Sequence, residues 1–397
     1  MIEVNGTSTL AVPTTYNSSP GLIACGLILG CVINAQVRAV VPRDPPDANV
    51  LTPAQWKKVD NAVDRGLAYL ASQQLPDGSI PTFETGQPAV TSLAVMAFLS
   101  RGHSPGEGPY GAKIERAIDY VLAQQRDDGL LYGVSTDMPS TSWYRGSHTA
   151  MYNHAIAGLM LGEAFGMTDE ARAQKLRPAI EKAIEFARNM QRRPSPYAKD
   201  KYGWRYLKHH GISDKGEADL SVTGWYIMFY RSAKNAEFDI PQEYVEEAIQ
   251  FVRECYHAED GTFLYGPYGE DAHTGRAMNG AGLLCLTITG NYDDKIATSA
   301  GRWILARPFT QYNVHNKLDR YHYGAYYCSQ AMFMLGGGYW RQFYPKLAGT
   351  LLENQTPAGH WQPESKGNDA LFGNCYTTAL AILSLTPPYQ MLPIYQR

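Results

Sequence analysis

A short motif built around a glycine recurs along the 397-residue chain and limits its fold more than any other feature. The clearest copy begins at Gln355 and ends at Trp361, and four weaker copies precede it. Their separations of 51, 74, 58 and 98 residues fit a period near fifty, because the last is close to two periods of 49. Such a period indicates a repeat architecture. The marker glycines are Gly78, Gly129, Gly203, Gly261 and Gly359.

Between these motifs, stretches with an apolar stripe alternate with stretches that are apolar on nearly every side. Helical spacing of the apolar residues predicts an amphipathic helix for the first kind and a fully buried helix for the second. Thr52 and Pro53 suit the N-cap and the first position of the earliest helix. The six expected pairs are 52–74 with 90–99, 114–125 with 152–161, 180–191 with 222–232, 244–256 with 278–286, 296–306 with 326–335, and 344–353 with 376–385.

One amphipathic and one apolar helix per repeat predict two concentric layers, with the apolar helices inside. Six pairs suffice to close a ring, which removes exposed ends. We therefore predict an all-α fold for residues 52–397, an (α/α)6 toroid or double-layered helical barrel of six helix-hairpin repeats. The long connections from outer to inner helix should meet at one mouth of the barrel, where a ligand site is expected.

Composition excludes some classes of function. The net charge is -3 and no run of Lys or Arg interrupts the sequence, so no nucleic-acid partner is expected. The 27 tyrosines, 7 tryptophans and 12 phenylalanines suit an aromatic-lined cavity, or alternatively simple packing between helices. Six cysteines without a CxxC motif or dense spacing predict neither a zinc ribbon nor a disulfide scaffold.

Residues 1–51 differ from the rest of the chain. Residues 21–35 form an apolar run of the length found in signal peptides, shorter than a comfortable membrane span, although the preceding residues carry Glu3 and no Lys or Arg. Residues 40–51 are rich in Pro and Asp and suit a linker. We expect a signal or anchor followed by a linker, with residues 21–35 as the membrane tether if they are retained. The protein is then exported, to the periplasm or the cell envelope.

The segment from Gln355 to Trp361 resembles the QW motif of squalene–hopene cyclases. With its weaker copies, it makes residues 52–390 similar to the prenyltransferase and squalene-cyclase repeat superfamily. Residues 202–206, 219–225 and 392–397 further resemble planctomycete members of that superfamily. The resemblance implies a toroid whose lumen handles isoprenoids or terpenoids.

Class II cyclases of that superfamily protonate their substrate with the middle Asp of an Asp-x-Asp-Asp-Thr motif. The best match is residues 219–223, where Asp219 and Thr223 agree. Ser221 replaces the proton donor and Val222 replaces the third Asp. Because a serine hydroxyl cannot protonate an alkene, the standard cyclase mechanism is not expected. Asp219 is the candidate catalytic residue, and the alternative role for it is a helix cap.

Protein prenyltransferases of the same superfamily bind zinc through Asp-x-Cys and a histidine. At the corresponding place Asp219 matches, but Ser221 stands where the thiolate belongs. Cys375 lies at a comparable place in the sixth repeat, with Gly373 in the Asp position. Zinc needs several such ligands together, so we expect no metal and no other cofactor.

Polar and aromatic residues of the mouth loops and adjoining inner helices are the candidate ligand-binding groups, because converging loops would bring them to one cavity. A structural alternative exists for some of them, since Arg205 can pair with Asp219 across its loop. The candidate substrate-binding residues are His148, Trp204, Arg205, Trp225, His273, Arg276, His322, Tyr323 and Tyr327.

Three classes of function stay open. The first is a terpene cyclase- or prenyltransferase-like barrel that binds an isoprenoid, a lipid or another hydrophobic molecule in its lumen, with or without catalysis. The second is a non-catalytic binding or structural barrel of the cell envelope. The third is a carbohydrate-active toroid, which would need two carboxylates about 5–9.5 Å apart. Glu217 and Asp219 are the only close acidic pair in a mouth loop, so this class ranks last.

Overall fold

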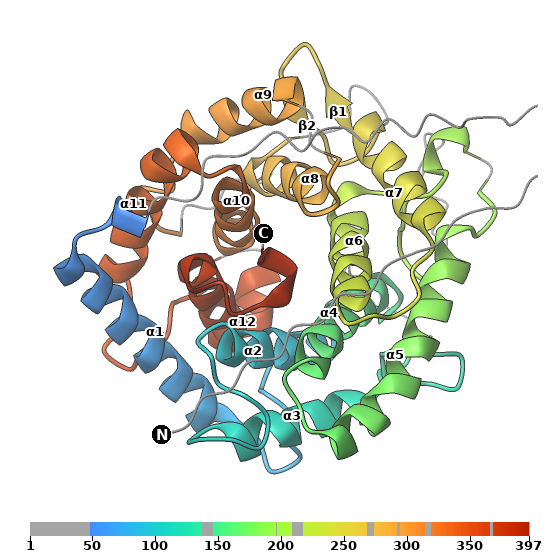
Figure 1. Ribbon diagram of the computed structural model, residues 1–397, viewed down its shortest axis with the longest axis horizontal. Coiled ribbons are helices and arrows are strands. Elements are labelled where there is room, and N and C mark those ends of the chain that lie inside the picture. The colour runs from blue at the N-terminus through green and yellow to red at the C-terminus, as the bar shows by residue number, and fades with distance from the viewer. Residues whose placement is uncertain are drawn as a thin grey trace, which may run out of the picture. The chain divides into compact units, whose positions relative to one another are not determined.

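Twelve α-helices in the described part of the chain alternate between two concentric rings (Figure 1). This computed structural model describes residues 48–136, 146–195, 197–208, 217–267, 274–291, 294–313, 319–365 and 368–396. The outer ring consists of α1 (Pro53–Gln73), α3 (Gly111–Ala123), α5 (Glu170–Gln191), α7 (Gln242–Glu254), α9 (Asp294–Leu305) and α11 (Gly337–Glu353). The inner ring consists of α2 (Ala89–Leu99), α4 (Gly146–Phe165), α6 (Leu220–Asn235), α8 (Arg276–Ile288), α10 (Tyr321–Leu335) and α12 (Asn368–Leu385).

The inner ring is closed. Each inner helix packs against the next, and α12 packs back against α2. Every residue of α2 is buried, as expected for a helix that is covered on all sides. The predicted (α/α)6 toroid is therefore confirmed, with all six helix pairs present. Outside the α-helices, the described residues include a short β-hairpin of two antiparallel strands, β1 (Tyr256–His257) and β2 (Thr262–Phe263).

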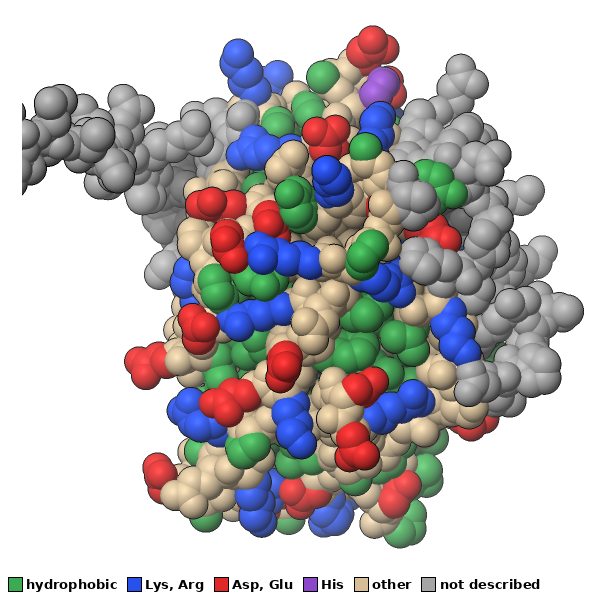
Figure 2. Space-filling view, turned by 90° about the vertical axis from the view of Figure 1, so that its right-hand side faces the viewer, with side chains coloured by type: hydrophobic (Ala, Val, Ile, Leu, Met, Phe, Trp, Pro, Cys, Tyr) green, Lys and Arg blue, Asp and Glu red, His purple; other side chains and the backbone are tan. Residues whose placement is uncertain are grey.

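The outer helices are amphipathic because one face meets the inner ring and the other meets solvent. In α1, Val59, Val63 and Leu67 are buried. The N-cap Thr52, which precedes Pro53, forms a capping box with Gln55. Acidic and basic side chains are interspersed over the outward face in Figure 2, with no large area of one sign. No helix of the described residues has the length and apolarity to cross a membrane. Residues 21–35 lie outside the described part, so their role as tether stays a prediction.

Two outer helices begin earlier than the sequence predicts. The expected start of α5 at residue 180 is wrong by ten residues, because the helix continues through Pro178 from its N-cap Asp169. Similarly, α11 starts at Gly337 and passes through Pro345. A proline removes one helical hydrogen bond, but packing of the flanking apolar residues, such as the buried Leu176, outweighs that loss.

The glycine motif joins neighbouring repeats, and its last copy closes the ring. The side-chain amide of Gln355 donates to Gly359 O at 2.7 Å and, across the closure, to Ala62 O of α1 at 2.8 Å. Gly359 has φ +93°, and a Cβ there would lie 2.6 Å from the backbone oxygen of Arg65 in α1. Trp361 is fully buried and donates from Nε1 to Leu351 O at 2.8 Å. One turn thus joins Gln355 to Ala62, 293 positions earlier in the sequence.

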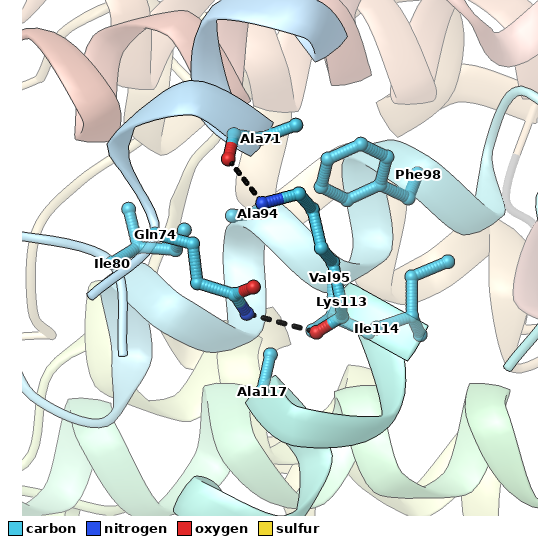
Figure 3. Close-up of a pocket in the computed structure, with 9 residues that line it drawn as sticks. All are labelled: Ala71, Gln74, Ile80, Ala94, Val95, Phe98, Lys113, Ile114 and Ala117. Carbon is cyan, nitrogen blue, oxygen red and sulfur yellow. Dashed lines mark hydrogen bonds between the residues drawn. The ribbon is translucent and has the colours of Figure 1, made fainter. Parts of the chain in front are cut away.

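Earlier copies of the motif act in the same way. Gln74 donates to Gly78 O at 3.0 Å and to Lys113 O of α3 at 2.8 Å, and Lys113 Nζ returns a hydrogen bond to Ala71 O (Figure 3). Gln125 likewise donates to Gly129 O at 3.2 Å and to Ala179 O of α5 at 2.8 Å. In each case a glutamine from one outer helix binds a backbone carbonyl of the next outer helix.

A second recurring contact fixes the motif to the inner ring. A backbone N–H within two residues of the marker glycine donates to a buried polar side chain on the following inner helix. In the second repeat this acceptor is His154 Nδ1, whose Nε2 lies 3.1 Å from Ala183 O. Burial lowers the pKa of His154 to about 3, so the ring is neutral and serves the fold. The five acceptors are Thr91, His154, Thr223, Asn279 and Thr378.

The C-terminal segment packs on the inner ring at the C-terminal ends of its helices. Figure 1 shows the C-terminus near the axis of the ring. The hydroxyls of Tyr395 and Tyr326 are 2.8 Å apart, and the buried Glu163 accepts from Ile394 N at 3.2 Å. Tyr326 in turn stacks on Trp225 with ring centroids 5.3 Å apart. These aromatic side chains fill the lumen at this end of the barrel.

Ring closure through Gly359 can be tested with a pair of glycine variants. We expect Gly359→Ala to lower the free energy of unfolding by about 2–3 kcal/mol, because alanine tolerates φ +93° poorly and its Cβ meets the Arg65 carbonyl. Gly349→Ala is the control, since this mid-helix glycine has open space around it and should gain about 0.5–1 kcal/mol. Urea denaturation followed by circular dichroism measures both; equal stabilities for the two variants would contradict the closure role.

Candidate functional site

A cavity of about 590 Å³ opens among the N-terminal halves of the six inner helices. Its volume falls within the range of roughly 300–1,000 Å³ found for small-molecule sites. The wall is largely apolar and aromatic, and its charged groups lie in two clusters, one at the start of α6 and one where α10 and α12 begin. Bordering residues include Ala89, Val90 and Leu93 of α2, Tyr152 and Ile156 of α4, Trp225 of α6, Ala277 and Met278 of α8, Tyr323 of α10, and Phe372 and Tyr376 of α12.

The first polar cluster is centred on Asp219, the N-cap of α6. Its Oδ1 accepts hydrogen bonds from Ser221 Oγ and Val222 N, both at 2.8 Å. Its Oδ2 accepts from Arg205 Nη1 at 2.7 Å and from Tyr265 Oη at 2.8 Å. We call Asp219 with Arg205, Ser221 and Tyr265 the Asp219 cluster.

The Asp219 carboxylate is fully buried and all of its acceptor capacity is engaged within the cluster. It does not border the cavity, whereas Arg205, Ser221 and Tyr265 do. Arg205 also lies over the ring of Tyr206 at 4.2 Å, and the Tyr152 and Ser221 hydroxyls are hydrogen bonded. Asp219 thus has both of the structural roles that the sequence suggested for it, as a helix cap and as the ion-pair partner of Arg205. The cluster presents tyrosine and serine hydroxyls and one neutralised guanidinium to the cavity.

The second polar cluster lies where α10 and α12 begin, and consists of Arg320, Asp369 and Tyr376. Asp369 is 1% exposed, and burial together with the nearby Glu364 raises its pKa to about 7. Burial also raises the pKa of Tyr376, so its hydroxyl stays protonated. We call these three residues the Asp369 cluster.

Asp369 and Tyr376 are not among the binding residues predicted from the sequence. Residue 369 falls between the two helices predicted for the sixth repeat, 344–353 and 376–385, but α12 begins at Asn368. An acidic residue just before the apolar run of the sixth repeat was the available signal, because this position is the first turn of an inner helix that faces the mouth. Nothing in the sequence alone marks its burial.

Four of the candidate binding residues border the cavity: His148, Arg205, Trp225 and Tyr323. Tyr323 and Trp225 meet through an indole-to-hydroxyl hydrogen bond of 3.0 Å. Tyr327 is fully buried behind them, with its ring centroid 5.4 Å from that of Trp225.

The other candidates serve the packing of the barrel or lie outside the described residues. Trp204 stacks on Tyr226 and donates to Ala187 O at 3.0 Å. Arg276 pairs with Asp319 at 2.5 Å and lies over the ring of Phe309. His322 Nε2 lies 3.1 Å from Gln362 O, and burial lowers the pKa of His322 to about 4. His273 lies outside the described part of the chain.

In the described residues, no three His, Cys, Asp or Glu side chains gather closely enough to hold a metal ion. Cys375 is 4% exposed, and burial raises the pKa of its thiol to about 11. The other described cysteines, Cys255, Cys285 and Cys328, are also buried and free. A thiolate is therefore disfavoured at these positions.

No protein-family model matches the sequence, and no curated protein matches it significantly. Solved structures do match the fold. A type II terpene cyclase, MstE from Scytonema, in complex with geranylgeranyl dihydroxybenzoate, superposes with a TM-score of 0.54 at 16% identity, covering 86% of this chain and 100% of that one. An inactive variant of an α-1,6-mannanase, GH76A of Salegentibacter sp. HEL1_6, in complex with α-1,6-mannotriose, superposes with a TM-score of 0.58 at 10% identity, covering 85% and 99%.

These two neighbours share the toroid with this protein but act on chemically different compounds. At such identities the likeness shows the fold alone. The choice between an apolar and a carbohydrate ligand therefore depends on the cavity wall of this chain.

The coupling between Asp219 and Arg205 can be measured with a double-mutant cycle. We expect Asp219→Ala to cost about 3–5 kcal/mol of unfolding free energy, because it removes a cap and leaves a largely buried guanidinium without its counter-ion. Arg205→Met leaves the buried carboxylate unpaired, and the double variant should cost at least about 1 kcal/mol less than the sum.

Asp169→Ala is the matched control for the cap alone. Asp169 caps α5 at an exposed position and should cost about 1 kcal/mol. If Asp219→Ala costs no more than Asp169→Ala in urea denaturation, the ion pair contributes nothing to stability.

Proposed function

We propose that the protein binds an isoprenoid or another hydrophobic small molecule in the cavity between its inner helices. The observation that carries the proposal is the 590 Å³ cavity with a mostly apolar and aromatic wall. Ligand burial against such a wall is favourable by roughly 25 cal/mol per Å² of apolar surface removed from water.

The aromatic side of the wall suits an unsaturated chain. Trp225 and Tyr323 from α6 and α10, with Phe372 and Tyr376 from α12, border the cavity with their rings. Their polarizable faces pack well against alkenes, and they also stabilise positive charge. Aliphatic side chains of α2, α4 and α8 complete the wall. The terpene cyclase neighbour, solved in complex with a geranylgeranyl compound, supports the proposal because its toroid holds a chain of this kind.

The chemistry of a glycosidase finds less support at this cavity. Hydrolysis of a glycosidic bond uses two carboxylates on either side of the bond. Among the described residues that border the cavity, Asp369 is the single carboxylate. Glu217 does not border it, and Asp219 is buried behind Arg205.

Filling the cavity tests the proposal. Ala277 is buried in the wall, so Ala277→Phe should occupy part of the cavity and weaken binding of a C20 isoprenoid alcohol at least about tenfold. Ala112→Phe, at an exposed position of α3, is the control and should leave binding unchanged. Quenching of tryptophan fluorescence measures the dissociation constant, because Trp225 borders the cavity.

The result has two clear readings. Saturable binding to the wild type, lost in Ala277→Phe and kept in Ala112→Phe, supports the proposal. Absence of saturable binding of any apolar probe, together with native mass spectra that show no retained lipid, would contradict it.

A further inference from the structure

Among the described residues, three ionisable Arg and Asp side chains border the cavity, and only Arg205 has an internal ion-pair partner. Arg205 is neutralised by Asp219 at 2.7 Å. Asp369 keeps its proton up to about neutral pH, since burial raises its pKa to about 7. The Arg320 guanidinium has no hydrogen bond or ion pair with a described residue, and its Nη1 is buried without a partner, although the residue borders the cavity at the start of α10.

The Arg320 guanidinium has a buried N–H donor without an acceptor, which is unfavourable for the folded protein. A guanidinium presents five N–H donors in a planar fork. Its Nη1 is sealed from solvent and has no acceptor in the described structure, and a buried donor without an acceptor loses the hydrogen bonds that it made to water. An acceptor supplied by a ligand would remove that cost.

Asp369 adds a second unsatisfied atom in the same cluster. Its Oδ2 is buried without a hydrogen-bond partner, and no ion pair joins it to Arg320 among the described residues. A protonated carboxyl can donate one hydrogen bond, so it complements an anionic acceptor that an ionised carboxylate would repel. Glu364 also lies near, but its carboxylate accepts from the backbone N–H of Tyr321 and does not border the cavity.

We propose that the ligand bound in this cavity carries a carboxylate, which Arg320 binds with its guanidinium fork while the carboxyl group of Asp369 makes a further hydrogen bond to it. This inference rests on the proposed function and names the polar end of the hydrophobic ligand. The chain of the ligand lies along the apolar wall, and its acidic end lies in the Asp369 cluster.

The geometry favours a single negative charge over a diphosphate. Arg320 is the one cation of the described cavity wall that lacks a counter-ion, and the described residues offer no metal-binding group to neutralise further charge. The inner helices also direct their N-terminal ends at the cavity, and their dipoles add a modest preference for negative charge.

Matched ligands separate this inference from the proposed function. A C20 isoprenoid carboxylic acid, its methyl ester and the corresponding diphosphate are titrated against the wild type at pH 6.5, with tryptophan fluorescence as readout. We expect the acid to bind at least about tenfold more tightly than the ester, the range that one charge-assisted bidentate contact provides. In Arg320→Gln the acid and the ester should bind equally, while Arg302→Gln, at an exposed position of α9, should keep the wild-type preference.

Each outcome has one meaning. Equal binding of acid and ester to the wild type overturns the carboxylate inference and leaves hydrophobic binding intact. Tighter binding of the diphosphate than of the acid also overturns it. Failure of both acid and ester to bind contradicts the proposed function itself.

The pH dependence gives an independent test. As pH rises from 6 to 8.5, Asp369 loses its proton near its pKa of about 7, so it no longer donates and repels the carboxylate. Affinity for the acid should therefore fall about tenfold over this range, whereas affinity for the ester stays constant.

The titratable groups near Asp369 determine which control variant the pH experiment needs. Burial raises the pKa values of Tyr323 and Tyr376, so both hydroxyls stay neutral over this range. Glu364 accepts from the backbone N–H of Tyr321, and His148 borders the cavity from α4. Asp369→Asn keeps a neutral donor, so its affinity for the acid should no longer change with pH. If the affinity of this variant for the acid still falls with pH as in the wild type, the role of Asp369 is overturned.

Discussion

The hydrogen bond from a glutamine amide to a carbonyl of the next outer helix is the contact on which the architecture depends. A helical hairpin cannot bury its own apolar helix, so each repeat needs a neighbour at a fixed distance and angle. Gln74, Gln125 and Gln355 each supply a directional contact of this kind, next to a glycine whose missing Cβ lets the backbone of the neighbouring helix approach closely. Because the Gln355 contact joins the last repeat to the first, the same local rule that stacks repeats also closes them.

Closure has a direct effect on the site. Six inner helices with the same direction place six N-terminal turns around one opening, where backbone N–H groups and first-turn side chains converge. The chain uses this opening in two ways. The Asp219 cluster satisfies its own hydrogen bonds, which stabilises the connection before α6, whereas the Asp369 cluster leaves donors and acceptors unpaired. The Asp219 cluster therefore serves the structure of the cavity wall, whereas the Asp369 cluster is where the polar end of the proposed ligand would bind.

The fold could be predicted from sequence because its determinants are local and repeated. The marker glycines, the glutamine four residues before three of them, and the alternation of amphipathic and fully apolar segments can all be read from the sequence. In the structure Gly78, Gly129 and Gly359 have φ of 92°, 91° and 93°. The site was less accessible, since bordering the cavity depends on which side of an inner helix a residue occupies and on how its neighbours pack. Trp225 and Tyr323 face the cavity, whereas Arg276 and His322, on equivalent early turns, are engaged by Asp319 and Gln362. Asp369 was not predicted as a site residue because the sequence pattern predicts that this helix begins at residue 376, whereas α12 begins at Asn368.

The aromatic stack beneath Trp225 has a consequence for the size of what the protein can hold. Tyr326 and Tyr395 obstruct the axis below that indole, so the lumen is a blind well rather than a conduit. The proposed ligand would have to leave by the route it came, and the depth of the well would act as a ruler for its chain length. Trimming the obstruction, for example at Tyr395, would lengthen the ruler without touching either polar cluster.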